Sequence, residues 1–225
     1  MTRQIERLRP DQIEAALAEA SLIYLPLGTI EWHCHHLPVG LDALTAHGLC
    51  LRAAEQTGGL VWPALYYGTG GDHGMFPWTV MMPDAAEIEA LLTFTLRRLR
   101  DLGVQRVVLF SGHFAETQLE MIDRIAGAWA ATGAGPKLIA LSVNRAPVPG
   151  FAPDHAGLFE TTLLDGLVPG LSNLAGLSAA ADAPDRFDPR SPLWGIVGTD
   201  PRQVPPLGPE ALSETLVDWL AASVG

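Results

Sequence analysis

The sequence has few of the features that mark secreted, membrane-spanning or nucleic-acid-binding proteins. Its 225 residues include only two cysteines, Cys34 and Cys50, which form neither a disulfide framework nor a CxxC spacing. No apolar run approaches the roughly 18 residues that a membrane-spanning helix needs. Lysine and arginine number 14 against 25 acidic residues, and the net charge of −11 argues against nucleic-acid and anionic-membrane partners.

The N-terminal stretch is charged and lacks an apolar core. Residues 1–7 therefore do not resemble a signal peptide, and we expect a cytoplasmic protein. Because 48% of the residues are hydrophobic, the chain can bury a sizeable core. We expect one domain over residues 1–225.

Histidine is scarce, but its distribution is uneven. Four of the seven histidines fall between His33 and His47, and Glu31 and Asp42 frame the main cluster. Carboxylate oxygens and imidazole nitrogens suit Zn²⁺, Mn²⁺ and Fe²⁺. Glu31 and His33 are two residues apart after an apolar strand pattern, so an extended backbone would point both the same way. Residues 31–47 are therefore a candidate metal-binding segment.

Each of these residues also has a purely structural interpretation. Histidines gather on exposed loops by chance, and Asp42 precedes a helical pattern, where it could be only an N-cap. For Cys34 the structural interpretation, a small buried side chain, is favoured over a metal ligand. The choice between the structural and the metal-binding interpretation depends on whether other segments bring ligands to the same place.

Strand and helix patterns alternate along the chain. The periodicity predicts strands over 22–27, 60–65, 106–110 and 137–143, and helices over 10–20, 43–57, 84–102, 114–132, 158–167 and 210–222. Such alternation favours right-handed βαβ units and a mostly parallel sheet, hence an α/β fold. Residues 170–209 show little periodicity and are expected to form a functional or interface loop.

Two further histidines follow expected strands. His113 comes after the strand over 106–110, and His155 lies between Asp154 and Glu160 near the start of the helix over 158–167. In parallel sheets, ligands bind beyond the carboxyl ends of the strands. We therefore expect three loops that are distant in sequence to converge. The structural alternatives are a first-turn surface position for His113 and an N-cap role for Asp154.

These segments, in this order, resemble the creatininase family, the creatinine amidohydrolases and their relatives. The family motif P-x-G-S-x-E-x-H-G-x-H-L-P-x-x-x-D is matched over residues 26–42, and H-x-x-F-P-G-T over 73–79. The N-G-H element corresponds to 111–113, H-A-G-x-x-E-T-S to 155–162, and the late G-x-x-G-D-P is similar to 195–201. The resemblance implies a three-layer α/β/α fold with a mostly parallel sheet.

The resemblance also implies a two-metal hydrolase that opens cyclic amides or cleaves related C–N bonds. Carried over residue by residue, it assigns one divalent ion to Glu31, Asp42 and His113. It assigns a second ion to His33 and Asp42, with Asp42 as the bridge. The implied cofactors are therefore two divalent metal ions, Zn, Mn or Fe.

The resemblance further assigns proton transfer and substrate binding. His155 matches the family's proton-transfer histidine, which would protonate the departing nitrogen. Asp154 would either orient that imidazole or act as a simple N-cap, and the sequence leaves both open. The residues expected to contact a small-molecule amide substrate are His36, His73, Trp78 and Phe114.

The chain departs from creatininase at the second metal. Ala115 stands where creatininase has a metal-binding glutamate, two residues after the N-G-H histidine. We expect Glu160 to supply the missing carboxylate because it lies in a matched motif. Glu116 is the alternative, but on a helix it is about 100° away from the matched position.

Two departures concern the substrate pocket and point away from creatinine. Phe114 stands where creatininase has tyrosine, and Trp78 replaces the glycine of F-P-G-T, which would narrow the pocket. We therefore expect another lactam, cyclic imide, formamide or small modified amide. The alternatives are a family peptidase or deformylase, and a catalytically silent metal-binding assembly subunit. The family also tends to form ring-like hexamers, so the resemblance implies a homo-oligomer.

Overall fold

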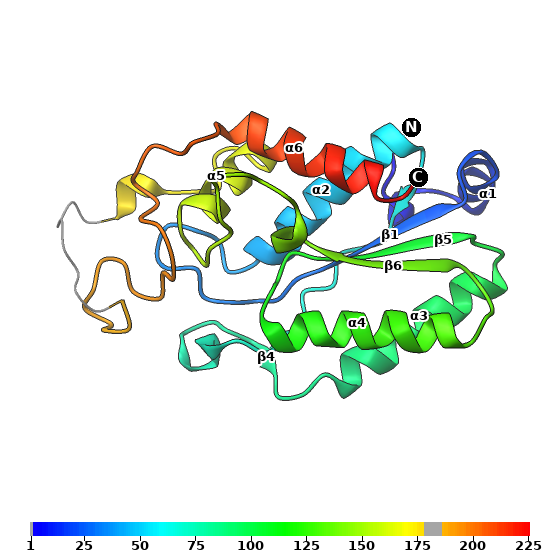
Figure 1. Ribbon diagram of the computed structural model, residues 1–225, viewed down its shortest axis with the longest axis horizontal. Coiled ribbons are helices and arrows are strands. Elements are labelled where there is room, and N and C mark those ends of the chain that lie inside the picture. Colours follow the sequence, from blue (N-terminus) through cyan, green and yellow to red (C-terminus); the bar gives the residue numbers. More distant parts are fainter. Residues whose placement is uncertain (1, 178–185) are drawn as a thin grey trace.

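A parallel sheet lies at the centre of the molecule (Figure 1). The computed structural model describes residues 2–177 and 186–225, and within them four strands form this sheet in the order β2-β1-β5-β6. The strands are β1 (Leu22–Leu27), β2 (Leu60–Val61), β5 (Arg106–Ser111) and β6 (Lys137–Ser142). The predicted parallel α/β sheet is confirmed.

Helices cover both faces of the sheet and make three layers (Figure 1). One face carries α2 (Leu41–Thr57), α5 (Leu158–Leu167) and α6 (Pro209–Ala222), which pack against one another. The core of the other face is formed with α1 (Pro10–Glu19), α3 (Ala86–Asp101) and α4 (Glu116–Ala131). The helices predicted from periodicity are all present. None of the helices in the described part of the chain is long and apolar enough to cross a bilayer.

Strand β1 shows why the sheet must be covered on both sides. All six of its residues are buried, as expected for a strand between two helical layers. Leu22 and Tyr24 pack into the core with α2 and α6, whereas Ile23, Leu25 and Leu27 pack into the core with α3 and α4. Successive side chains point to opposite faces of a strand, so one continuous apolar run supplies both cores.

The structure differs from the sequence pattern between residues 60 and 83. The expected strand over 60–65 is reduced to the two residues of β2, and Pro63 offers no N–H to continue the ladder. Residues 66–83, for which the periodicity predicts neither strand nor helix, contain a second, two-stranded sheet of β3 (Gly68–Thr69) and β4 (Met81–Met82). A short 3₁₀ helix, Asp72–Met75, lies between these strands.

Two glycines allow α2 to begin against the ends of β1 and β5. A Cβ atom on Gly28 would lie 2.1 Å from the nitrogen of Ala43, and one on Gly112 would lie 2.0 Å from the carbonyl oxygen of Asp42. Only glycine permits such an approach of two backbones. The N-cap of α2 is Gly40, and Asp42 lies within the first turn, so the N-cap interpretation of Asp42 is wrong.

The long loop over residues 170–209 lies partly outside the described residues, at 178–185. In its described part, Val197 forms an antiparallel bridge with His155, and Arg186 donates a hydrogen bond to the carbonyl of Gly198. The loop therefore packs against the segment before α5. Its expected role as an oligomer interface remains a prediction.

Candidate metal centre

Loops from three parts of the chain meet beyond the carboxyl ends of the strands. Glu31 and His33 follow β1, His113 follows β5, and Glu160 lies in the first turn of α5. Together with Asp42 of α2, these side chains are buried, each with 5% exposure or less. The convergence expected from the parallel sheet is present, and it gathers three carboxylates and two imidazoles in the protein interior.

The first group of ligand atoms surrounds His113. Its Nδ1 lies 3.0 Å from Oε2 of Glu31 and 3.2 Å from Oδ2 of Asp42. Its Nε2 donates a hydrogen bond of 3.2 Å to the carbonyl of Gly70, which leaves Nδ1 facing the two carboxylates. Two ligands that bind one tetrahedral zinc ion at 2.0–2.1 Å lie roughly 3.3–3.4 Å apart. The spacing therefore suits a single divalent ion.

The second group surrounds His33. Its Nε2 lies 3.2 Å from Oδ1 of Asp42 and 3.6 Å from Oε2 of Glu160. Its Nδ1 donates a 3.0 Å hydrogen bond to the carbonyl of Glu31, a second contact of the kind that orients metal-binding histidines. The two oxygens of Asp42 thus face different groups, as a bridging carboxylate requires. Glu116, the alternative to Glu160, opens α4 and does not line the cavity described below.

Several ligand atoms in these groups have no hydrogen-bond partner among the described residues. They are Oε2 of Glu31, Nε2 of His33 and Oδ2 of Asp42, all fully buried. Leaving such a group unpaired costs about 1–3 kcal/mol, so a native protein satisfies it in some way. Cations placed between these oxygens and nitrogens would satisfy all three atoms. The donor set therefore fits two divalent ions.

Electrostatics distinguish the two outer carboxylates. Burial alone would raise the pKa of Glu31, but the adjacent rings of His113 and His73 outweigh it and hold that pKa well below its usual range. Burial holds the pKa of Glu160 well above its usual range, because the opposing effect of His33 is smaller and the charge of Asp42 adds to the penalty. Glu160 therefore holds its proton more strongly than Glu31 does, and an ion that binds Glu160 must displace that proton.

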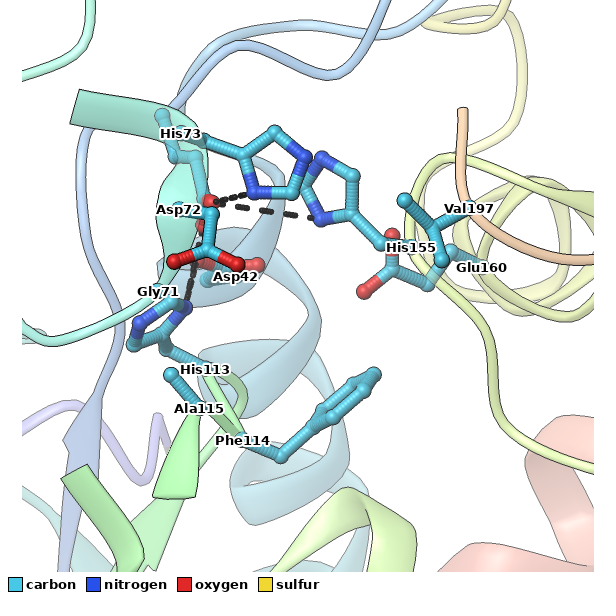
Figure 2. A pocket seen from close by; sticks show the side chains of 11 residues that line it. Asp42, Gly71, Asp72, His73, His113, Phe114, Ala115, His155, Glu160 and Val197 are labelled. Carbon is cyan, nitrogen blue, oxygen red and sulfur yellow. Dashed lines mark ion pairs between the residues drawn. The ribbon is translucent and has the colours of Figure 1, made fainter. Parts of the chain in front are cut away.

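A cavity of about 230 Å³ opens beside these groups (Figure 2). Phe114 and Val197 give it apolar walls, and Asp72 and His73 come from the 3₁₀ helix after β3. The full lining consists of Glu31, Asp42, Gly71, Asp72, His73, His113, Phe114, Ala115, His155, Glu160 and Val197. A substrate in this cavity would contact both the candidate ligands and the apolar walls.

His155 is held in the cavity by main-chain groups. Its Nε2 donates a 2.9 Å hydrogen bond to the carbonyl of Trp32, so the neutral ring carries its lone pair at Nδ1. Burial, together with the neighbouring His33, lowers the pKa of His155 to about 3 and keeps the ring neutral. Its backbone pairs with that of Val197 through hydrogen bonds of 2.8 and 2.9 Å.

Asp154 has a different role from the one that orients an imidazole. Its carboxylate accepts hydrogen bonds from the backbone N–H groups of Phe159 (3.1 Å) and Glu160 (3.3 Å) at the start of α5. The contacts therefore favour the capping interpretation. The carbonyl of Trp32, which sequence reasoning missed, supplies the hydrogen bond to the ring of His155.

The four expected substrate contacts fall into two pairs. His73 and Phe114 line the cavity. His36 is buried with its Nε2 3.0 Å from the hydroxyl oxygen of Thr161, so it connects the 33–38 loop to α5. Trp78 is 78% exposed, and neither it nor His36 is among the lining residues.

Sequence reasoning also missed Asp72 and Val197 as lining residues. Asp72 is adjacent to His73 in a matched motif, and Val197 lies within the 195–201 segment that resembles a late family motif. Both could have been found by extending each motif to its neighbours. Cys34 does not join the ligand atoms, because its thiol lies 3.6 Å from the carbonyl of Pro192.

Comparisons with known proteins agree with this geometry. The sequence model of a family described as "Creatininase: Creatinine amidohydrolase" matches residues 6–224. Creatinine amidohydrolase of Pseudomonas putida is 29% identical over 228 residues, which cover 91% of this chain and 84% of that protein. Mycofactocin precursor peptide peptidase of Mycolicibacterium smegmatis is 33% identical over 98 residues, 41% of this chain and 39% of that protein.

Solved structures give the same result for the fold. A creatininase variant complexed with creatine superposes with a TM-score of 0.79 at 26% identity, covering 100% of this chain and 98% of that chain. Other solved creatininases of 26% identity are described as Zn–Zn and Mn forms.

Proposed function

This chain belongs to the creatininase family of amidohydrolases, and we propose that it is a two-metal enzyme that cleaves the C–N bond of a small cyclic or related amide. The observation that carries this proposal is the gathering of buried carboxylates and imidazoles at one cavity. Two divalent ions held there would polarise the amide carbonyl and lower the pKa of a water molecule. The proposed ligands are Glu31, His33, Asp42, His113 and Glu160.

In this proposal Asp42 would hold both ions, because its two carboxylate oxygens face His33 and His113. Glu31 and His113 complete the first position, and His33 and Glu160 complete the second. The 3.0–3.6 Å spacings between these atoms support the assignment. Glu160 is held for this role by the N–H of Ala156, which donates a 2.7 Å hydrogen bond to its Oε2.

We assign proton transfer to His155. With Nε2–H donated to Trp32, Nδ1 is free to accept a proton as water adds to the amide carbon. The same nitrogen then delivers the proton to the leaving nitrogen as the C–N bond breaks. The products are a carboxylate and an amine. Asp154 acts on this step indirectly, because capping α5 fixes the backbone between His155 and Glu160.

The shape and chemistry of the cavity support a small, partly apolar substrate. A volume of about 230 Å³ is below the roughly 300–1,000 Å³ of pockets for drug-sized ligands. Phe114 and Val197 add apolar surface beside the ligands. A lactam, cyclic imide, formamide or small modified amide fits these properties, and we propose His73 and Phe114 as its contacts.

A peptidase is the second candidate, since a relative is a mycofactocin precursor peptide peptidase. A peptide would have to place its scissile bond in the same cavity while its flanking residues lie outside. The small volume therefore favours the small-amide proposal over a peptidase.

The direct test is metal analysis of protein purified without chelator, followed by a panel of lactams, cyclic imides, formamides, creatinine and short peptides. We expect two ions per chain and hydrolysis of a small amide. Creatinine should be a poor substrate, because Phe114 lacks the hydroxyl of the creatininase tyrosine. Creatinine hydrolysis with kcat/KM of about 10⁴ M⁻¹s⁻¹ or more would contradict that expectation. Hydrolysis of peptides alone would favour the peptidase, and a metal-loaded but inert protein the assembly subunit.

A further inference from the structure

The carboxylate of Glu31 makes a second set of contacts through its other oxygen. Oε1 lies 3.1 Å from Nδ1 of His73 and 4.0 Å from Nδ1 of His155. Ligand atoms of these three residues lie within 4.8 Å of one another. The rings of His73 and His155 lie side by side (Figure 2) and stack, with centroids 3.9 Å apart and an interplanar angle of 24°. Two imidazole nitrogens and one carboxylate oxygen are therefore gathered at one place.

These atoms differ from those of the two positions described above. The first position uses Oε2 of Glu31, Oδ2 of Asp42 and Nδ1 of His113. The second uses Oδ1 of Asp42 with atoms of His33 and Glu160. The new group shares Glu31 with the first position but shares no atom with either.

We propose that Glu31 Oε1, His73 Nδ1 and His155 Nδ1 form a third position for a divalent cation, and that filling it inhibits the enzyme. Two histidines and a glutamate are a known zinc donor set. His73 is 8% exposed, and Nδ1 of its ring faces Oε1 of Glu31 at 3.1 Å. Glu31 and the stacked ring of His155 fix the orientation of His73, and Nδ1 can bind an ion when the ring proton is on Nε2.

The third position is expected to be weaker than the other two. It has one anionic oxygen, and that oxygen belongs to a carboxylate already used by the first position. Two ligands of one tetrahedral zinc ion lie roughly 3.3–3.4 Å apart, so the 4.0 Å between Oε1 of Glu31 and Nδ1 of His155 requires the ring to shift. The ion should therefore bind only when zinc is in excess over the first two positions.

Inhibition follows from the atom that the ion would occupy. A cation at this position takes the lone pair on Nδ1 of His155, and the proposed function uses that lone pair for proton transfer. The inference rests on the proposed function in this respect. A competing arrangement joins His155 to His33 and Glu160, whose atoms also lie within 4.8 Å of one another. His73 belongs to the group with Glu31 and His155 and not to the group of His33, His155 and Glu160.

Zinc titration of the metal-free protein separates these possibilities. Equilibrium dialysis with elemental analysis is carried out on the wild type, His73→Ala and the control His47→Ala, whose ring lies on α2 and does not line the cavity. At high zinc, we expect His73→Ala to bind one ion per chain fewer than the wild type and His47→Ala. Activity, relative to each protein's own two-ion value, should fall at high zinc except in His73→Ala.

Equal zinc content and equal inhibition in the wild type and His73→Ala would overturn the third position. His73→Phe keeps a ring against His155 without a nitrogen ligand, and replaces His73→Ala if that variant does not fold by circular dichroism. Failure of this inference alone leaves the two ions of the proposed centre and amide hydrolysis in place. If the proposed function itself is wrong, the wild type will lack the two bound ions or will not hydrolyse amides.

Discussion

The two proposed metal positions share Asp42 but are built from different parts of the fold. The first takes Glu31 and His113 from loops at the ends of adjacent paired strands, β1 and β5. The second takes His33 from a loop and Glu160 from the first turn of α5. The pairing of β1 and β5 therefore sets the geometry of the first position. The geometry of the second position also depends on how α5 packs against the sheet.

The two positions also differ in the pKa of the carboxylate that each does not share, Glu31 in the first and Glu160 in the second. The adjacent rings of His113 and His73 hold the pKa of Glu31 well below its usual range, although burial opposes them. Glu160 has its nearest cationic group 3.6 Å away, and burial holds its pKa well above the usual range. Glu31 is therefore ionised before any ion arrives, whereas an ion at the second position must displace a proton from Glu160. We therefore expect the second ion to bind more weakly.

Asp42→Asn should produce the largest effect, because it removes the charge that both positions share. We expect loss of both ions and of activity by more than the roughly 10²–10⁴-fold range of a lost general acid–base. Metal content after dialysis and turnover on the best amide measure this. Retention of one tight ion would show that the two positions are independent and that Asp42 does not bridge.

His155→Ala should produce the next largest effect, since its ring lies next to His33 and near Glu31 but is assigned no ion in the proposed centre. We expect both ions to remain and turnover to fall by roughly 10²–10⁴-fold, the usual scale of general acid–base catalysis. Metal analysis beside steady-state kinetics checks both parts. Unchanged turnover would make His155 a structural residue.

Cys34→Gly should produce the smallest effect, and it should be a gain in stability rather than a loss of metal or activity. Cys34 has a φ of 57°, in the left-handed region that glycine tolerates, and it occupies a glycine position of the family motif. We expect unchanged metal content and a gain of about 1 kcal/mol in the free energy of unfolding. Cys34→Ala is the control, because it removes the thiol but keeps the strain. Metal loss in both variants would make the thiol a ligand.

The sheet and the convergence of its loops could be predicted from the sequence. Apolar runs such as 22–27 and 106–110 have few alternatives to buried strands, and the parallel arrangement brings the residues after them together. The strand pattern alone is therefore enough to place Glu31, His33 and His113 at one edge of the sheet, where the structure has them.

The sequence could not reveal contacts that depend on loop conformation. The orientation of His155 depends on the carbonyl of Trp32, 123 residues away. Every residue has a backbone carbonyl, so the sequence does not show which one will accept this hydrogen bond. Trp78 was expected to narrow the pocket because it replaces a family glycine. Its φ of 60° indicates that the glycine served the backbone conformation, and the Trp78 side chain is exposed. A motif position can thus encode a backbone angle rather than a pocket wall.

The most direct test of two unequal metal positions is stepwise titration of metal-free protein with Zn²⁺ or Mn²⁺, with bound metal and activity followed at each step. We predict one ion that survives dialysis and one that a mild chelator removes, with activity following the second. Glu160→Gln should weaken only the labile ion, whereas the control Glu116→Gln should bind both as the wild type does. Two equally tight ions, unaffected by Glu160→Gln, would contradict the account.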